Sequence, residues 1–267
     1  MLVSYHNADD MEIMSSDYFP STVAGFPDSW MDRTTELDAY YGVEYGAKDF
    51  GIADDLAANN KLFGQADINI ASTLSDDQST VNIEAEVVFP YELADGNFVV
   101  EYILTSDGLT DADWGQSNYY AGGSQGNPLY MDVFSNGEST IYGLVYNDVA
   151  VLTSEMLGGS ENVVTAAAAD VPVKLSYKFP LAYAVNTANA PVIQDVNNLK
   201  VVALLIDATT GKVVNANKAK LGTSTGISII EAGNRSNSAT YFDLQGRRVV
   251  KPAKGLYINN GRAVIVK

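Results

Sequence analysis

The sequence predicts a mainly β protein in which an N-terminal α/β part is followed by an antiparallel β-sandwich and a small C-terminal β tail. Three observations lead to this prediction. Apolar and polar side chains alternate with a period of two from about residue 66, the chain is rich in strand and turn formers with 16 tyrosines and 22 glycines, and the sign of the charge changes near residue 240. The length of 267 residues is enough for one large domain or two modest ones.

Residues 1–65 have the pattern of a mixed α/β segment. The predicted elements are a buried strand at 2–6, a short helix at 17–24, a strand at 29–32 and an amphipathic helix at 46–63, which Gly64 would end. Because a chain seldom begins inside a core strand, we also expect a natural segment to precede Met1.

Residues 66–221 predict an antiparallel, Ig-like β-sandwich. The alternation is clearest where Val81, Ile83, Ala85 and Val87 are separated by polar residues. Further strands are expected at 68–70, 98–104, 143–152, 171–179, 199–206 and 212–215, with glycine- and asparagine-rich turns between them. The last two strands flank Thr210-Gly211 and form the best-defined hairpin of the chain.

Residues 222–240 have the composition of a linker, and residues 241–267 form a tail with short strands expected at 239–244, 255–258 and 263–266. Residues 1–240 hold 10 basic and 32 acidic residues, whereas the tail holds six basic residues and one acidic residue. This change of sign indicates a module boundary.

Composition excludes several classes of function. The net charge of −17 opposes contact with phosphate backbones, so a nucleic-acid partner is not expected. The chain contains no cysteine, which excludes disulfides, thiolate metal sites and thiol redox chemistry within it. No apolar run is long enough for a transmembrane helix, and the residues indicate no cofactor.

The tail resembles the C-terminal sorting signal of the type IX secretion system of Bacteroidetes-like bacteria. The matching residues are Tyr241, Asp243, Leu244, Gly246, Arg247, Val249, Lys254, Gly255, Leu256, Tyr257 and the run from Gly261 to Lys267. The resemblance implies export, followed by attachment to the surface or release, and places the protein in the outer membrane, on the cell surface or in the medium. A small β appendage with no sorting function is the alternative.

The rest of the chain resembles the Omp28-type outer-membrane lipoprotein family. The residues that carry the likeness are 3–11, 25–33, 199–207 and 211–216. The resemblance implies a partial thioredoxin-like unit before the sandwich and a cis-proline at Pro27, for which an ordinary trans loop is the alternative. The Cys-x-x-Cys helix often found in that family is absent here, so a thiol oxidoreductase relative would be degenerate and without redox activity.

Catalytic candidates are few. His6 is the only histidine, and any general base or zinc ligand of this residue type would have to be it, although a polar strand end explains it equally well. Ser124 and Ser224 each lie in a Gly-x-Ser-x-Gly motif, but neither motif is followed by a helical pattern, and the histidine precedes both. We therefore expect a protein that is not an enzyme.

Two groups of residues are candidates for binding. Asp107, Asp111 and Asp113 cluster within seven residues and offer the hard oxygens that calcium prefers, although a solvated turn is the simpler interpretation. Trp114, Tyr119, Tyr120 and Tyr130 lie in a stretch rich in glycine, serine and asparagine, where they would dock a partner or a sugar if they are exposed, or form core if they are not.

Taken together, these features predict an exported, non-catalytic protein with a binding or structural role at the cell envelope, whose partner is an unknown protein or glycan. A carbohydrate-binding or adhesin module is the alternative. An array of glycans tested with Trp114→Ala as the control would separate the two.

Overall fold

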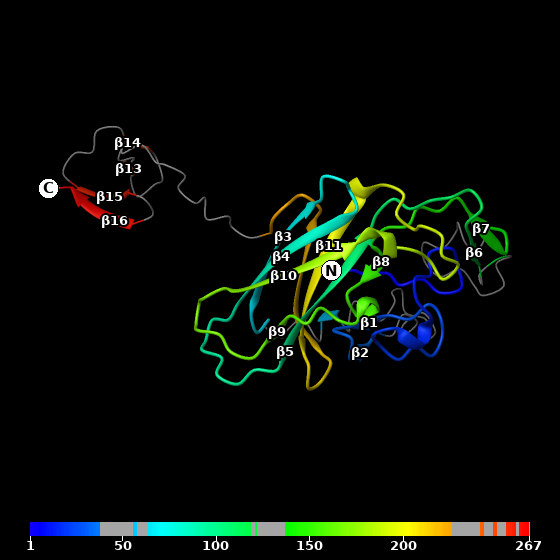
Figure 1. The fold of residues 1–267 in the computed structure, drawn as a ribbon, viewed down its shortest axis with the longest axis horizontal. Coiled ribbons are helices and arrows are strands. Elements are labelled where there is room, and N and C mark those ends of the chain that lie inside the picture. The colour runs from blue at the N-terminus through cyan, green and yellow to red at the C-terminus, as the bar shows by residue number, and fades with distance from the viewer. Residues whose placement is uncertain are drawn as a thin grey trace. The chain divides into compact units, whose positions relative to one another are not determined.

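The computed structural model describes two compact units, Met1–Ile227 and Ser228–Lys267 (Figure 1). Within them it describes residues 1–37, 56–57, 64–118, 121 and 137–225, together with the strands of the second unit.

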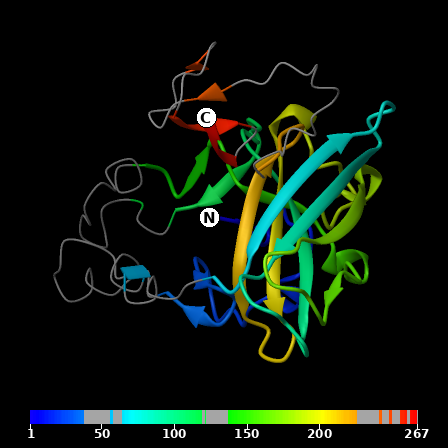
Figure 2. The ribbon, with the colours of Figure 1, turned by 90° about the vertical axis from the view of Figure 1, so that its left-hand side faces the viewer.

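Two antiparallel sheets form the centre of the first unit (Figure 2). The small sheet has the order β10-β4-β3, and its strands are β3 (Asp67–Leu74), β4 (Thr80–Val88) and β10 (Val173–Pro180). The large sheet has the order β12-β11-β5-β8, with β5 (Phe98–Ser106), β8 (Val149–Thr153), β11 (Leu199–Asp207) and β12 (Val213–Lys220). The short strand β9 (Val163–Val164) also pairs with β5. The mainly β, antiparallel fold class predicted from the sequence is confirmed.

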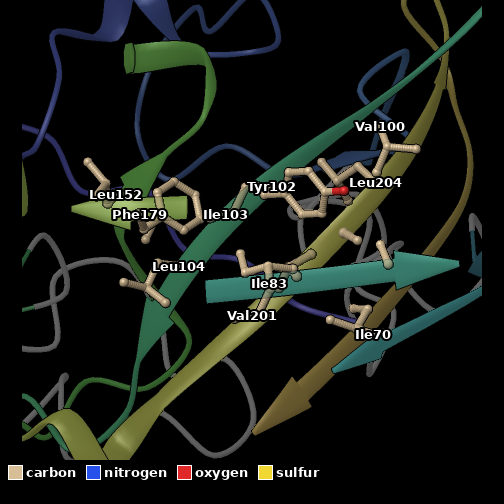
Figure 3. Close-up of a cluster of buried hydrophobic side chains, with 14 of the residues drawn as sticks. Ile70, Ile83, Val100, Tyr102, Ile103, Leu104, Leu152, Phe179, Val201 and Leu204 are labelled. Atoms are coloured by element: carbon tan, nitrogen blue, oxygen red, sulfur yellow. The ribbon is translucent and has the colours of Figure 1, made fainter. Parts of the chain in front are cut away.

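The core lies between the two sheets (Figure 3). Every second residue of β4 is buried, as the alternation of Val81, Ile83, Ala85 and Val87 predicts. The ring of Tyr102 on β5 stacks on that of Tyr177 on β10, with the ring centroids 5.2 Å apart. This stack joins the inner faces of the two sheets.

The large sheet is buried on both faces. Eight of the nine residues of β5 are buried, and β11 has the same nearly continuous pattern, which is typical of strands covered on both sides. The N-terminal segment lies on the β8 side of this sheet, where the Ser4 amide donates to the Asp148 carbonyl and the Ala150 amide donates to Ser4. Met11 and Ile13 of this segment belong to the core.

Part of the N-terminal prediction is wrong. Residues 2–6 form a single parallel bridge, Ser4 to Val149, in place of a buried strand, and Leu2 is 64% exposed. The segment is apolar, but only one of its residues reaches the edge of β8. The expected helix at 17–24 is the three-residue 3-10 helix η1 (Ser16–Tyr18), because Phe19 is already extended before Pro20.

The other N-terminal elements are short. β1 (Trp30–Met31) pairs with β2 (Thr35–Glu36), which agrees with the strand expected at 29–32. Leu56 and Ala57 are helical, and the rest of the helix expected at 46–63 lies outside the described residues.

The strand expected at 143–152 is also shorter than predicted. Gly143 and Asp148 have positive φ values of 71° and 56°, so the backbone cannot stay extended before Val149. Two short strands precede it in the chain, β6 (Gly115–Ser117) and β7 (Thr140–Tyr142), and they pair with each other in a sheet of their own. Further 3-10 turns of this unit are η3 (Glu155–Leu157), η4 (Leu181–Tyr183) and η5 (Val196–Asn198).

The corner between the edge strands β3 and β12 is closed by polar side chains. The amides of Asn215 and Asn217 on β12 donate to the carbonyls of Ala66 and Ile68, at 2.5 and 2.6 Å. Residues 222–225, assigned above to the linker, continue along β3, and the Thr225 amide donates to the Ile70 carbonyl. An open groove at this corner is lined by the same asparagines, by Asp67 and by apolar residues such as Ile68 and Val88.

The second unit contains a four-stranded antiparallel sheet with the order β14-β13-β15-β16. Its strands are β13 (Tyr241–Phe242), β14 (Arg248–Val249), β15 (Gly255–Asn259) and β16 (Arg262–Val266). Three of these strands fall at the positions expected from the sequence.

Within the described part of the chain, none of the helices combines the length and the apolar character needed to cross a bilayer.

Candidate functional site

A cluster of polar and aromatic side chains forms where the N-terminal segment meets the β6–β7 hairpin. It consists of His6, Asp9, Trp114, Gln116 and Tyr146, and we call it the polar–aromatic site. The N-terminal segment supplies the first two residues, β6 and the residue before it supply the next two, and Tyr146 is held by backbone bonds to Leu109 in both directions.

Asp9 is the centre of this site. Its carboxylate accepts hydrogen bonds from His6 Nδ1 at 2.6 Å, from Gln116 Nε2 at 2.8 Å and from the Met11 amide at 2.9 Å. The side chains of His6 and Asp9 are 12% and 13% exposed. Partial burial works to raise the pKa of Asp9, but the bonds from His6, Met11 and Gln116 together hold that pKa below its ordinary value. Asp9 is therefore a fixed negative charge at neutral pH.

Two aromatic rings follow one another beside the histidine. The Tyr146 ring meets the His6 ring edge-on, with the centroids 5.3 Å apart, and the Trp114 ring lies 6.4 Å from Tyr146. The Tyr146 hydroxyl is enclosed beside the Gln116 amide without a hydrogen bond of good geometry. Burial raises the pKa of that hydroxyl, so it stays protonated and available as a donor.

The site unites two of the sequence candidates that were considered separately, His6 and Trp114. Trp114 is half-buried, so it is neither the fully exposed docking residue nor the core residue that the sequence left as alternatives. Tyr119, Tyr120 and Tyr130 lie outside the described residues. Gln116 and Tyr146 were missed by sequence reasoning. Their signal was weak, because each lies in a short segment without clear periodicity.

The structure gives the calcium candidates Asp107, Asp111 and Asp113 other partners. Asp107 is paired with Lys200 at 2.5 Å and accepts the Asp148 amide, while Asp111 accepts the Asp113 amide in a local turn. The described residues contain no group of three carboxylates or histidines placed to hold a metal ion. The sequence cluster is divided between an ion pair and a solvated turn.

A network of two lysines and two aspartates fastens the N-terminus to the large sheet. Lys218 donates to Asp148 at 2.8 Å and to the Leu2 carbonyl at 2.5 Å, and Lys200 reaches the same Asp148 oxygen at 3.1 Å. Partial burial raises the pKa of Asp148, but the hydrogen bonds and charges of Lys218 and Lys200 outweigh it. The pKa of Asp148 is therefore held below its ordinary value. This network is structural, since its charges are compensated within it.

A second buried polar cluster lies on β5. The carboxylate of Glu101 accepts hydrogen bonds from the Ser154 hydroxyl and from the Ser160 amide, the latter at 3.1 Å. All three residues are buried. Nearby, Arg33 makes a two-pronged pair with Glu155 at 2.8 and 2.9 Å, which attaches the N-terminal segment to η3.

The other sequence candidates have the following places. The Phe26–Pro27 peptide bond is cis. Ser224 bridges to Ala71 on β3, while Ser124 lies outside the described residues. In the tail, Tyr241 lies in β13, and Gly255 and Tyr257 lie in β15. Asp243, Leu244, Gly246, Arg247 and Lys267 lie outside the described residues.

Comparison with known proteins assigns the chain to no family. No protein family matches the sequence, and no curated protein matches it. Among solved structures, the chain is similar to HBP35 of Porphyromonas gingivalis, with 12% sequence identity and a TM-score of 0.43 over 91% of this chain and 75% of that one. A likeness this weak carries no inference about function.

Proposed function

We propose that the chain is an exported protein of the outer membrane, cell surface or medium that acts by binding and not by catalysis. The observation that carries the proposal is the separate compact unit of residues 228–267, whose sheet contains the sorting-type residues Tyr241, Gly255 and Tyr257. A sorting module has to be recognised independently of the protein to which it is attached, and a tail with its own sheet suits that requirement.

The polar–aromatic site supports the binding part of the proposal. Its carboxylate is held by three donors and its low pKa keeps it charged, whereas a general base works best with a pKa near the operating pH. Such a site is rigid before any partner arrives, which reduces the entropy lost on binding. Tyr142, on the neighbouring strand β7, is 59% exposed and adds an open aromatic ring of the kind used in recognition.

The export proposal is tested by a proline in β15. Ile258 pairs with Phe242 of β13 and with Ala263 of β16, so proline at this position removes a donor from a central strand. In the source bacterium, with any natural upstream segment retained, we expect the unchanged chain and Ile258→Ala on the surface or in the medium. Ile258→Pro is expected to stay inside the cell. Recovery of all three chains in the cytoplasm would rule the proposal out.

The proposal that the protein is not an enzyme is tested separately with the purified chain. A screen of hydrolase and transferase substrates is expected to show no turnover that depends on His6. Any activity that the unchanged protein has and His6→Ala lacks contradicts this part of the proposal.

A further inference from the structure

The β6–β7 hairpin has a second face, turned away from the polar–aromatic site. Gly115 is directly opposite Tyr142, and Ser117 is directly opposite Thr140, so these four residues share one face of the two strands. Gln116 and Ile141 belong to the other face. Because the Gln116 side chain reaches inward to Asp9, the face of Gly115 and Tyr142 is the outward one.

The Tyr142 ring packs against Gly115 on this outward face. A Cβ atom on Gly115 would come within 2.8 Å of Tyr142 Cε1 and 2.6 Å of Thr140 Cγ2, so the ring and the methyl group occupy the space that any other residue would need. Tyr142 is nevertheless 59% exposed. One side of the ring therefore rests on the glycine backbone while the rest of it is open to solvent. We call Gly115, Ser117, Thr140 and Tyr142 the tyrosine shelf.

We propose that the tyrosine shelf binds a neutral glycan, an inference that rests on the binding role proposed above and names its ligand class. The C–H-rich face of a pyranose ring packs on an open aromatic ring, and its hydroxyls pair with polar groups beside it. The shelf offers one such ring, packed against Gly115, with the hydroxyl-bearing residues Ser117 and Thr140 on the same face.

Size and charge favour a glycan over a protein partner. The shelf consists of four residues, far fewer than the roughly 20–30 residues that each side of a standard protein interface contributes. Its surroundings are acidic, since Asp111, Asp113 and Glu138 are exposed and the whole chain carries a charge of −17. That charge repels uronic-acid or sulfated sugars and leaves neutral or N-acetylated ones as the fitting class.

The test is an array of oligosaccharides probed with the purified full chain, followed by calorimetric titration of the strongest ligand. The array contains neutral hexamers derived from β-glucan, xylan, mannan and chitin, with heparin and polygalacturonate oligomers as anionic comparators. We expect binding to at least one neutral hexamer, weakened about tenfold by Tyr142→Ala, which corresponds to the loss of one stacked ring. Gly115→Ala keeps the tyrosine but displaces its ring, and it is expected to weaken binding as well.

The matched control is Tyr91→Ala. Tyr91 is 42% exposed and lies on the connection from β4 to β5, at the other end of β5 from the hairpin, so its removal is expected to leave glycan binding unchanged. The inference fails if no neutral hexamer binds, if only the anionic oligomers bind, or if Tyr142→Ala binds as tightly as the unchanged chain. The export experiment is independent, because a protein found on the surface that binds no glycan overturns this inference alone.

Discussion

Replacing Asp9 by alanine tests whether one carboxylate holds the polar–aromatic site together. The substitution removes the acceptor of three hydrogen bonds, from His6, Gln116 and the Met11 amide. A bond to a charged group contributes about 1.5–3 kcal/mol when it is buried. The side chain of Asp9 is 13% exposed and its three donors regain water in part, so we expect a total loss of about 2–3 kcal/mol in the free energy of unfolding.

The neighbouring Asp10 provides the matched control. It is exposed, and Asp10→Ala is expected to change the free energy of unfolding by no more than about 0.5 kcal/mol. Urea denaturation at pH 7 followed by tryptophan fluorescence gives both values, and hydrogen exchange at the Met11 amide reports the local effect. If Asp9→Ala is no more destabilising than Asp10→Ala, the carboxylate does not organise the site and the reasoning is wrong.

Three further outcomes follow from the described contacts. Phe179 is fully buried and its ring meets that of Tyr177 at 5.0 Å, so Phe179→Ala is expected to cost about 3–5 kcal/mol in urea denaturation. Asn217→Ala removes the bond to the Ile68 carbonyl, and we expect a loss of about 1–2 kcal/mol with faster hydrogen exchange at the Thr225 amide. The pKa values of Asp9 and Asp148 are lowered in the folded state, so their stabilisation is present above the ordinary value of 3.8 and is lost as the pH falls below it. Melting temperatures that stay constant from pH 5 to pH 2 would contradict this last expectation.

The sandwich strands were predictable because the patterns that favour them lie within short stretches of sequence. Along β4 the alternation of buried and polar residues follows directly from the pleat. The hairpin of β11 and β12 is indicated by Thr210-Gly211, where Gly211 has a φ of 72°. β5 and β11 have nearly unbroken apolar runs because a second layer covers the large sheet.

The candidate site was less predictable because its contacts are not local. Gln116 reaches Asp9 across 107 residues of sequence, and neither residue type nor spacing indicates that they meet. Tyr142 stood in a three-residue strand too short to show a period. The N-terminal strand was overpredicted because an apolar run does not by itself show that a segment pairs or is buried: Ser4 bridges Val149, while Leu2 is 64% exposed.

The asparagines that close the corner of the sandwich also affect how copies of the protein behave when they are crowded together. An open strand edge is a template on which another chain can add a strand. At β3 the carbonyls of Ala66 and Ile68 are already engaged by Asn215 and Asn217. At β10, the other edge of the small sheet, the exposed side chains of Lys174 and Lys178 place charge along the edge, which disfavours the addition of another strand. A protein displayed at high density would thus resist edge-to-edge association without needing a partner to cover it.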